Sequence, residues 1–182
     1  MSNIYLLKKK HQAKIFNLKF NLVGKKKYLL ILMGYKHGVW LVSNHPLLKT
    51  KHIPHFTVGC FMEKKDAFNL KEELSTKIGQ TLNINVASKN GFIFEDNRYP
   101  EDKNYLYAWG YNGSCNMWNT VKKIAENYKC NFSNTIHISM QYDKVKKNLK
   151  PFDLDKNVVA ECHFEVVNMY NENPLLWYLE KN

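Results

Sequence analysis

Hydrophobic and polar positions repeat along this chain with two different periods, which predicts a mixture of strands and helices. Short apolar or alternating runs that are rich in β-branched and aromatic residues are typical of strands. They lie at 13–23, 28–33, 39–43, 53–61, 91–96, 105–111, 134–142 and 158–170. The runs at 28–33 and 39–43 are separated by GYKHG, and these glycines predict a hairpin turn.

Two further segments carry apolar residues at the three- and four-residue spacing of an amphipathic helix. The first runs from about 66 to 78, with Gly79 placed to end it as a C-terminal cap. The second has Met117, Val121, Ile124 and Tyr128 on one face, with Ser114 near its N-terminus as a cap. The order of elements predicts an α+β fold of two comparable lobes, and 182 residues are enough for a single domain spanning 1–182.

Composition narrows the class of protein. The longest apolar run, at 28–35, is too short to cross a bilayer, and no signal-peptide pattern opens the chain. The four cysteines are widely separated and form no CxxC pair, so they indicate neither a zinc site nor a disulfide framework. We therefore expect a cytoplasmic protein with no cofactor, no bound metal, no membrane contact and no obligate protein partner.

The formal net charge is +11, and every basic residue except Arg98 is a lysine. Such a bias toward lysine, together with abundant Asn, Ile and Tyr, is what AT-rich coding produces. A lysine excess attracts phosphates at long range. Because codon bias accounts for much of it, the charge by itself does not indicate nucleic-acid binding.

Two four-residue segments share one pattern of histidine, apolar, hydroxyl and apolar residues. They are HFTV at 55–58 and HISM at 137–140, each within a predicted strand. Strand side chains alternate between faces, so one face should carry His55, Thr57 and Gly59 in the first strand and His137, Ser139 and Gln141 in the second. The apolar residues between them would then face the core.

Two such strands facing one another would bring two imidazoles and two hydroxyls around one small volume. A neutral imidazole can remove a proton from an attacking oxygen, and an imidazolium can donate one to the leaving oxygen. The hydroxyls of Thr57 and Ser139 can hydrogen-bond the phosphate oxygens that gain charge in the transition state. The sequence therefore predicts phosphodiester cleavage with His55 and His137 as catalytic residues and without a metal ion.

The paired segments HFTV and HISM resemble the H-x-T/S-x signatures of the 2H phosphoesterase superfamily, also called LigT-like. The resemblance spans roughly residues 13–170 and implies a two-lobed, pseudo-twofold α+β fold. In that fold antiparallel sheets line a central groove and helices lie outside. It also implies that His55, His137, Thr57 and Ser139 act on 2′-linked or 2′,3′-cyclic phosphates.

The small, AT-rich chain is similar to viral members that degrade nucleotides of immune signalling. This similarity implies a 2′-5′-linked substrate, either 2′-5′ oligoadenylate or cyclic GMP-AMP, in the host cytoplasm. Two alternatives stay open: an enzyme that opens RNA 2′,3′-cyclic phosphates or trims RNA ends, and a non-catalytic nucleotide- or RNA-binding module. Which histidine is the acid is not determined by the sequence.

Aromatic side chains that stack on bases are expected in a nucleotide site. Tyr107 and Trp109, which alternate with Tyr111 on one strand face, form either such a platform or the core side of a sheet. Tyr35, Trp40 and Tyr142 are further candidates. We expect surface roles for His52 and for the histidines at 11, 37 and 45, and we expect Trp177 to pack back on the domain.

Overall fold

The structure, a computed structural model, describes residues 36–95, 107–132, 135–171 and 173–181. They belong to one compact unit, Tyr35–Asn182. The fold is α+β, and its main component is an antiparallel sheet of eight strands within this part of the chain. The predicted strands at 13–23 and 28–33 and the aromatic candidate Tyr35 lie outside the described residues, so the hairpin between 28–33 and 39–43 is not tested.

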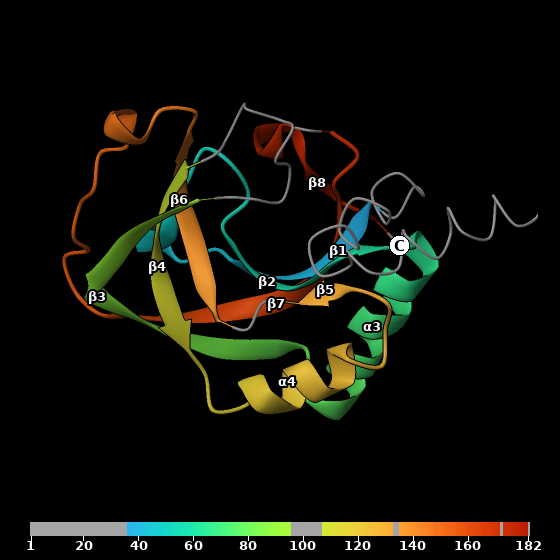
Figure 1. Cartoon of the computed structure of the whole chain (residues 1–182). Coiled ribbons are helices and arrows are strands. Elements are labelled where there is room, and N and C mark those ends of the chain that lie inside the picture. The colour runs from blue at the N-terminus through green and yellow to red at the C-terminus, as the bar shows by residue number, and fades with distance from the viewer. Residues whose placement is uncertain (1–35, 96–106, 133–134, 172, 182) are drawn as a thin grey trace, which may run out of the picture. The chain divides into compact units, whose positions relative to one another are not determined.

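Six strands follow one another in a closed order of antiparallel pairings. They are β1 (His37–Ser43), β2 (His55–Met62), β6 (His137–Asp143), β4 (Tyr107–Ser114), β3 (Thr81–Glu95) and β7 (Val158–Asn168), and β7 pairs again with β1. The short strands β5 (Asn131–Phe132) and β8 (Tyr178–Leu179) add to β2 and β7. Figure 1 shows this arrangement, with β4 and β6 side by side.

Two α-helices in the described residues complete the core. They are α3 (Lys64–Lys77) and α4 (Trp118–Ala125), which lie together at one side of the strands in Figure 1. Their apolar faces join the inward side chains of all six strands in one cluster. In the part of the chain that the structure describes, three single-turn 3₁₀ helices connect other elements, at Pro46–Leu48, Lys146–Asn148 and Pro174–Leu176.

The periodicity identified most of these elements correctly. The strands predicted at 39–43, 53–61, 105–111, 134–142 and 158–170 are confirmed within one to three residues at most ends. The helix predicted at 66–78 is α3, and Gly79 follows it at a positive φ of 122°, a conformation that favours glycine. Ser114 is not the cap of α4, because it ends β4 and the cap position is Met117.

One strand is longer than predicted. β3 begins at Thr81 rather than near 91, and its first half pairs with β7 while its second half pairs with β4. Leu82, Ile84 and Val86 are buried while Asn83 and Asn85 are exposed. This alternation was the signal available in the sequence, and it places the first half of β3 between the core and solvent.

None of the helices in the described part of the chain has both the length and the apolar composition needed to span a bilayer.

Candidate functional site

The two histidine segments lie on neighbouring strands. β2 and β6 run antiparallel, and Phe56 is the cross-strand partner of Ile138. Both side chains are completely buried in the core. Because side chains alternate along a strand, the residues that flank this pair turn to the opposite face of the sheet.

The antiparallel register determines how the four predicted site residues lie on that opposite face. One residue to either side of the Phe56–Ile138 pair, the antiparallel register makes His55 the neighbour of Ser139 and Thr57 the neighbour of His137. The two histidines are diagonal neighbours, a relationship in which Cα atoms are typically about 7–8 Å apart. The structure thus brings His55, Thr57, His137 and Ser139 together, as the paired segments predicted.

A local twofold axis relates the two segments. Rotation about an axis through the Phe56–Ile138 pair exchanges the strands of an antiparallel ladder. It moves His55 onto His137 and Thr57 onto Ser139. The two histidine-hydroxyl pairs are therefore equivalent in position, although they come from segments 82 residues apart in the chain.

Each segment ends in a bulge at its fourth residue. Between β1 and β2, Val39 pairs with Gly59 and Trp40 with Thr57, so Val58 has no partner in that ladder. Between β4 and β6, Trp109 pairs with Gln141 and Gly110 with Ser139, so Met140 is skipped in the same way. A bulge reverses the alternation beyond it, and both bulged side chains are buried in the core.

These bulges correct two expectations about faces. Gly59 was expected beside Thr57, but a Cβ there would lie 2.9 Å from the Sγ of Cys130, which packs against the core. Gln141 was expected beside Ser139, but it pairs with the core residue Trp109, and its side chain binds the backbone of Lys150. Tyr142 takes the position beyond Ser139 on the histidine face instead.

Trp40 and a backbone carbonyl fix the orientation of His55. The indole of Trp40 stacks on the imidazole with ring centroids 3.4 Å apart and planes within 8°. The Nδ1 atom of His55 lies 2.7 Å from the carbonyl oxygen of Ile53. A carbonyl only accepts hydrogen bonds, so Nδ1 carries the hydrogen, and in the neutral ring the lone pair is on Nε2.

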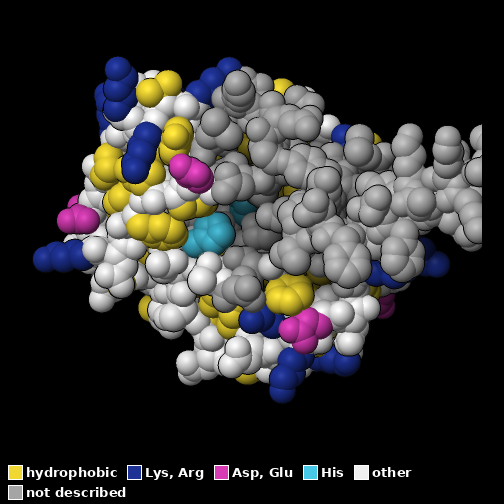
Figure 2. All heavy atoms as spheres, in the orientation of Figure 1, with side chains coloured by type: hydrophobic (Ala, Val, Ile, Leu, Met, Phe, Trp, Pro, Cys, Tyr) yellow, Lys and Arg dark blue, Asp and Glu magenta, His cyan; other side chains and the backbone are white. Residues whose placement is uncertain are grey.

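The other three site residues differ in exposure. Ser139 is buried, with 5% of its surface exposed, whereas His137 and Thr57 are half-buried. The ring of His137 packs edge-on against Phe94, with centroids 5.0 Å apart. In the orientation of Figure 1, histidine side chains reach the surface near the middle of the molecule, beside hydrophobic side chains (Figure 2).

His52 is a site residue that the sequence analysis assigned to the surface. Its Nε2 atom donates a hydrogen bond to the carbonyl oxygen of Ser139 at 2.9 Å. Its ring contacts both His55 and Tyr142 edge-on, with centroids 6.1 and 4.9 Å away. His52 therefore links the segment before β2 to the hydroxyl-bearing strand β6, a contact across 87 residues that no local pattern reveals.

The predicted aromatic residues fall on different faces. Trp109 and Tyr111 belong to the core cluster, and Tyr107 packs against it. Tyr142 and Trp40 lie on the histidine face through their contacts with His52 and His55. Trp177 packs back on the domain as expected, with its ring 5.7 Å from Trp40. The aromatic surroundings of the site thus come from β1, from Phe94 of β3 and from the end of β6 rather than from β4.

No group of three or more His, Cys, Asp or Glu side chains in the described ranges is placed to hold a metal ion. Burial raises the pKa of the Cys130 thiol and of the Cys162 thiol to about 12, so both remain protonated at neutral pH. Neither cysteine is a nucleophile in this state.

Comparison of the chain with models of protein families finds no match, and comparison with curated proteins finds none either. The site must therefore be interpreted from its own chemistry.

Proposed function

We propose that the protein is a metal-independent phosphodiesterase of the 2H type, in which His55 and His137 transfer protons on opposite sides of one phosphate. The observation that carries the proposal is the pairing of Phe56 with Ile138. It makes the two histidine-hydroxyl pairs neighbours on one face and equivalent about a local twofold axis. A phosphodiester that is attacked on one side and released on the other requires two such groups.

His55 is suited to act through Nε2. Its Nδ1–H is held by the carbonyl of Ile53, and its ring is fixed by the stack on Trp40. A fixed tautomer and ring plane favour proton transfer because the lone pair already points in one direction. Thr57 and Ser139 would each donate a hydroxyl hydrogen bond to a non-bridging phosphate oxygen.

For a 2′-5′ linkage the reaction balances without an added reagent. The 3′-hydroxyl beside the linkage attacks phosphorus while one histidine takes its proton. The bond from phosphorus to the 5′-oxygen breaks, and that oxygen receives a proton from the other histidine. The products are a 2′,3′-cyclic phosphate and a free 5′-hydroxyl.

We further propose 2′-5′ oligoadenylate or cyclic GMP-AMP as the substrate, so that the enzyme counteracts nucleotide-based immune signalling in the cytoplasm. The proposal rests on the resemblance of the paired segments. The net charge of +11 speeds encounter with phosphates but does not by itself select this substrate.

A panel of nucleotides tests the proposal. The purified protein is incubated in EDTA with 2′-5′ oligoadenylate, cyclic GMP-AMP, a 3′-5′ oligoadenylate and 2′,3′-cyclic AMP, and products are resolved by chromatography. We expect cleavage of a 2′-5′ linkage and an intact 3′-5′ oligomer. If 2′,3′-cyclic AMP is the only panel member that reacts, the proposed substrate is wrong and an enzyme acting on RNA ends is favoured. If no panel member reacts, the proposal of a phosphodiesterase is wrong.

A further inference from the structure

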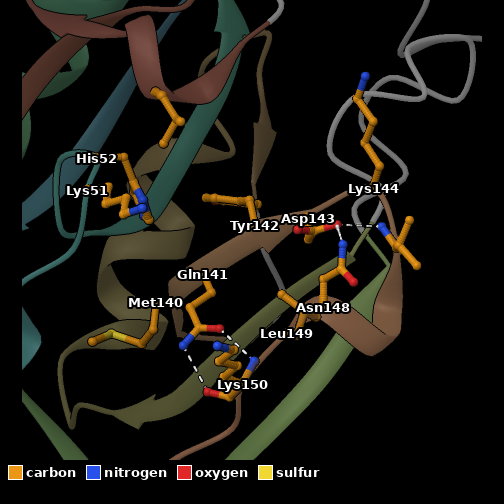
Figure 3. A pocket seen from close by; sticks show the side chains of 12 residues that line it. Lys51, His52, Met140, Gln141, Tyr142, Asp143, Lys144, Asn148, Leu149 and Lys150 are labelled. Atoms are coloured by element: carbon orange, nitrogen blue, oxygen red, sulfur yellow. Dashed lines mark hydrogen bonds between the residues drawn. The ribbon is translucent and has the colours of Figure 1, made fainter.

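A pocket of about 710 Å³ opens next to the histidine face, at the end of β6. Its wall on one side is His52 and Tyr142, whose side chains point toward one another in Figure 3. His52 also binds the backbone carbonyl of Ser139, so one residue of the pocket lining contacts the strand that carries this predicted phosphate contact. Its volume lies in the usual range for small-molecule sites, about 300–1,000 Å³.

Hydrogen bonds within the 141–150 segment hold the far wall of the pocket in place. The Gln141 side chain makes two hydrogen bonds of 2.9 Å with the backbone of Lys150, one as donor and one as acceptor. The Asp143 carboxylate accepts from the Val145 backbone and from the Asn148 amide (Figure 3). The pocket is therefore formed before any ligand binds, which lowers the entropy that binding costs.

The charge of the lining favours an anion. Lys51, Lys144 and Lys150 line the pocket, and Asp143 is the one acidic residue among the described residues that line it. Within the described ranges no carboxylate lies within ion-pair distance of these lysines, whereas Lys64, Lys71 and Lys77 each have such a partner. Asp143 keeps its negative charge, but three lysines against one carboxylate leave the described lining with an excess of positive charge.

The remaining lining favours a flat apolar group. Met140 and Leu149 are buried beneath the pocket, and Leu175 approaches from the segment after β7. Together with the rings of Tyr142 and His52 they provide the aromatic and apolar contacts on which a base can stack. An anionic group and a flat aromatic group are the two parts of a nucleotide.

We propose that this pocket binds a nucleoside 5′-phosphate, with the base against Tyr142 and the phosphate near Lys51 and Lys150. The role of the pocket as a subsite for the nucleotide next to the cleaved linkage rests on the proposed function. Binding of a free nucleotide does not depend on that function, because binding requires no proton transfer. In this arrangement the pocket sets which nucleotide flanks the phosphate held at His55 and His137.

Calorimetric titration of the His137→Ala chain with 5′-AMP, adenosine and inorganic phosphate tests the pocket without turnover. We expect 5′-AMP to bind at least tenfold more tightly than either fragment. Tyr142→Leu should weaken it about tenfold through lost stacking, and Lys51→Gln with Lys150→Gln should weaken it by a similar factor and reduce its salt dependence. Lys123→Gln, on the exposed side of α4, is the charge-matched control.

The outcomes separate the pocket from the reaction. Binding of 5′-AMP that depends on Tyr142 supports the pocket even if no nucleotide is cleaved. If a 2′-5′ substrate is cleaved and its KM is unchanged in the Lys51→Gln and Tyr142→Leu variants, the proposed role of the pocket is wrong. The proposed phosphodiesterase activity is then still supported. Equal affinity for inorganic phosphate and 5′-AMP also overturns it, because the base would then contribute nothing.

Discussion

Phe56 of β2 pairs with Ile138 of β6, and each occupies the second position of a histidine segment. The pair is buried on the core side, so it fixes two strands whose other faces carry the histidines and hydroxyls. The fourth residue of each segment, Val58 or Met140, forms a bulge toward the same core. One arrangement is thus built twice about a local twofold axis, which is unexpected for two unrelated strands.

Replacing either histidine should strongly slow cleavage of the proposed 2′-5′ substrate. We expect His55→Ala and His137→Ala each to lower kcat by about 10²–10⁴-fold, the range for loss of a general acid or base. His163→Ala, at an exposed position of β7, should leave kcat unchanged. Thermal unfolding of each variant checks the fold, and near-normal turnover by either site variant would exclude the two-histidine mechanism.

Gly110→Ala should damage the fold and the site together. A Cβ at this position would lie 2.0 Å from the carbonyl oxygen of Ile138, opposite Ser139 and next to the bulge of β6. We expect the free energy of unfolding in urea to fall by about 1–3 kcal/mol, as for other overpacked positions. The rate of cleavage should also fall, because the backbone that carries Ser139 must move.

Asn112→Ala is the matched control for this change, since Asn112 is exposed on the same strand and pairs with His137. Its stability should stay within about 0.5 kcal/mol of the parent. A Gly110→Ala chain as stable as the Asn112→Ala chain would show that β4 and β6 do not approach as closely as the structure has them.

Sequence periodicity was sufficient for most of the elements, because strands and helices differ in period. It also predicted that each histidine shares a face with the hydroxyl two positions on, and the β2–β6 register makes the two segments neighbours. The bulges at Val58 and Met140 were not predictable, since a skipped partner leaves no trace in a single strand. The bulge at Met140 is why Tyr142 replaces Gln141 on the site face. His52 was missed because its role depends on the path of a loop.

His52 should act as a positioning residue. His52→Ala removes the hydrogen bond to the carbonyl of Ser139, so we expect slower cleavage, by roughly tenfold, and a loss of stability of about 1 kcal/mol. His52→Gln offers an amide donor at a similar reach and should recover part of the rate. Cleavage that is slowed equally in both variants would mean that the imidazole itself, rather than its donor, is needed.

Glu180 should make stability depend on pH in an acidic window. Hydrogen bonds from Lys64, Asn168 and His37, in that order, lower the pKa of its carboxylate from 4.5 to about 2 against the opposing effect of burial. A pKa lowered in the folded state adds stability that is complete above pH 4.5 and is lost as the pH falls from 4.5 toward 2. Glu180→Gln should therefore be less stable than the parent at pH 7, with the difference shrinking across this window.

Urea unfolding at pH 7, 4.5, 3 and 2 measures this difference for Glu180→Gln. Glu161→Gln, at an exposed position of β7, is the control, and its difference from the parent should vary much less with pH. Lys64→Gln should share part of the pH-dependent loss, because the ammonium of Lys64 lies 2.8 Å from the Glu180 carboxylate. A constant difference between parent and Glu180→Gln from pH 7 to pH 2 would contradict the lowered pKa. It would mean that the contacts of Glu180 with Lys64 of α3 and His37 of β1 contribute no charge-dependent stability.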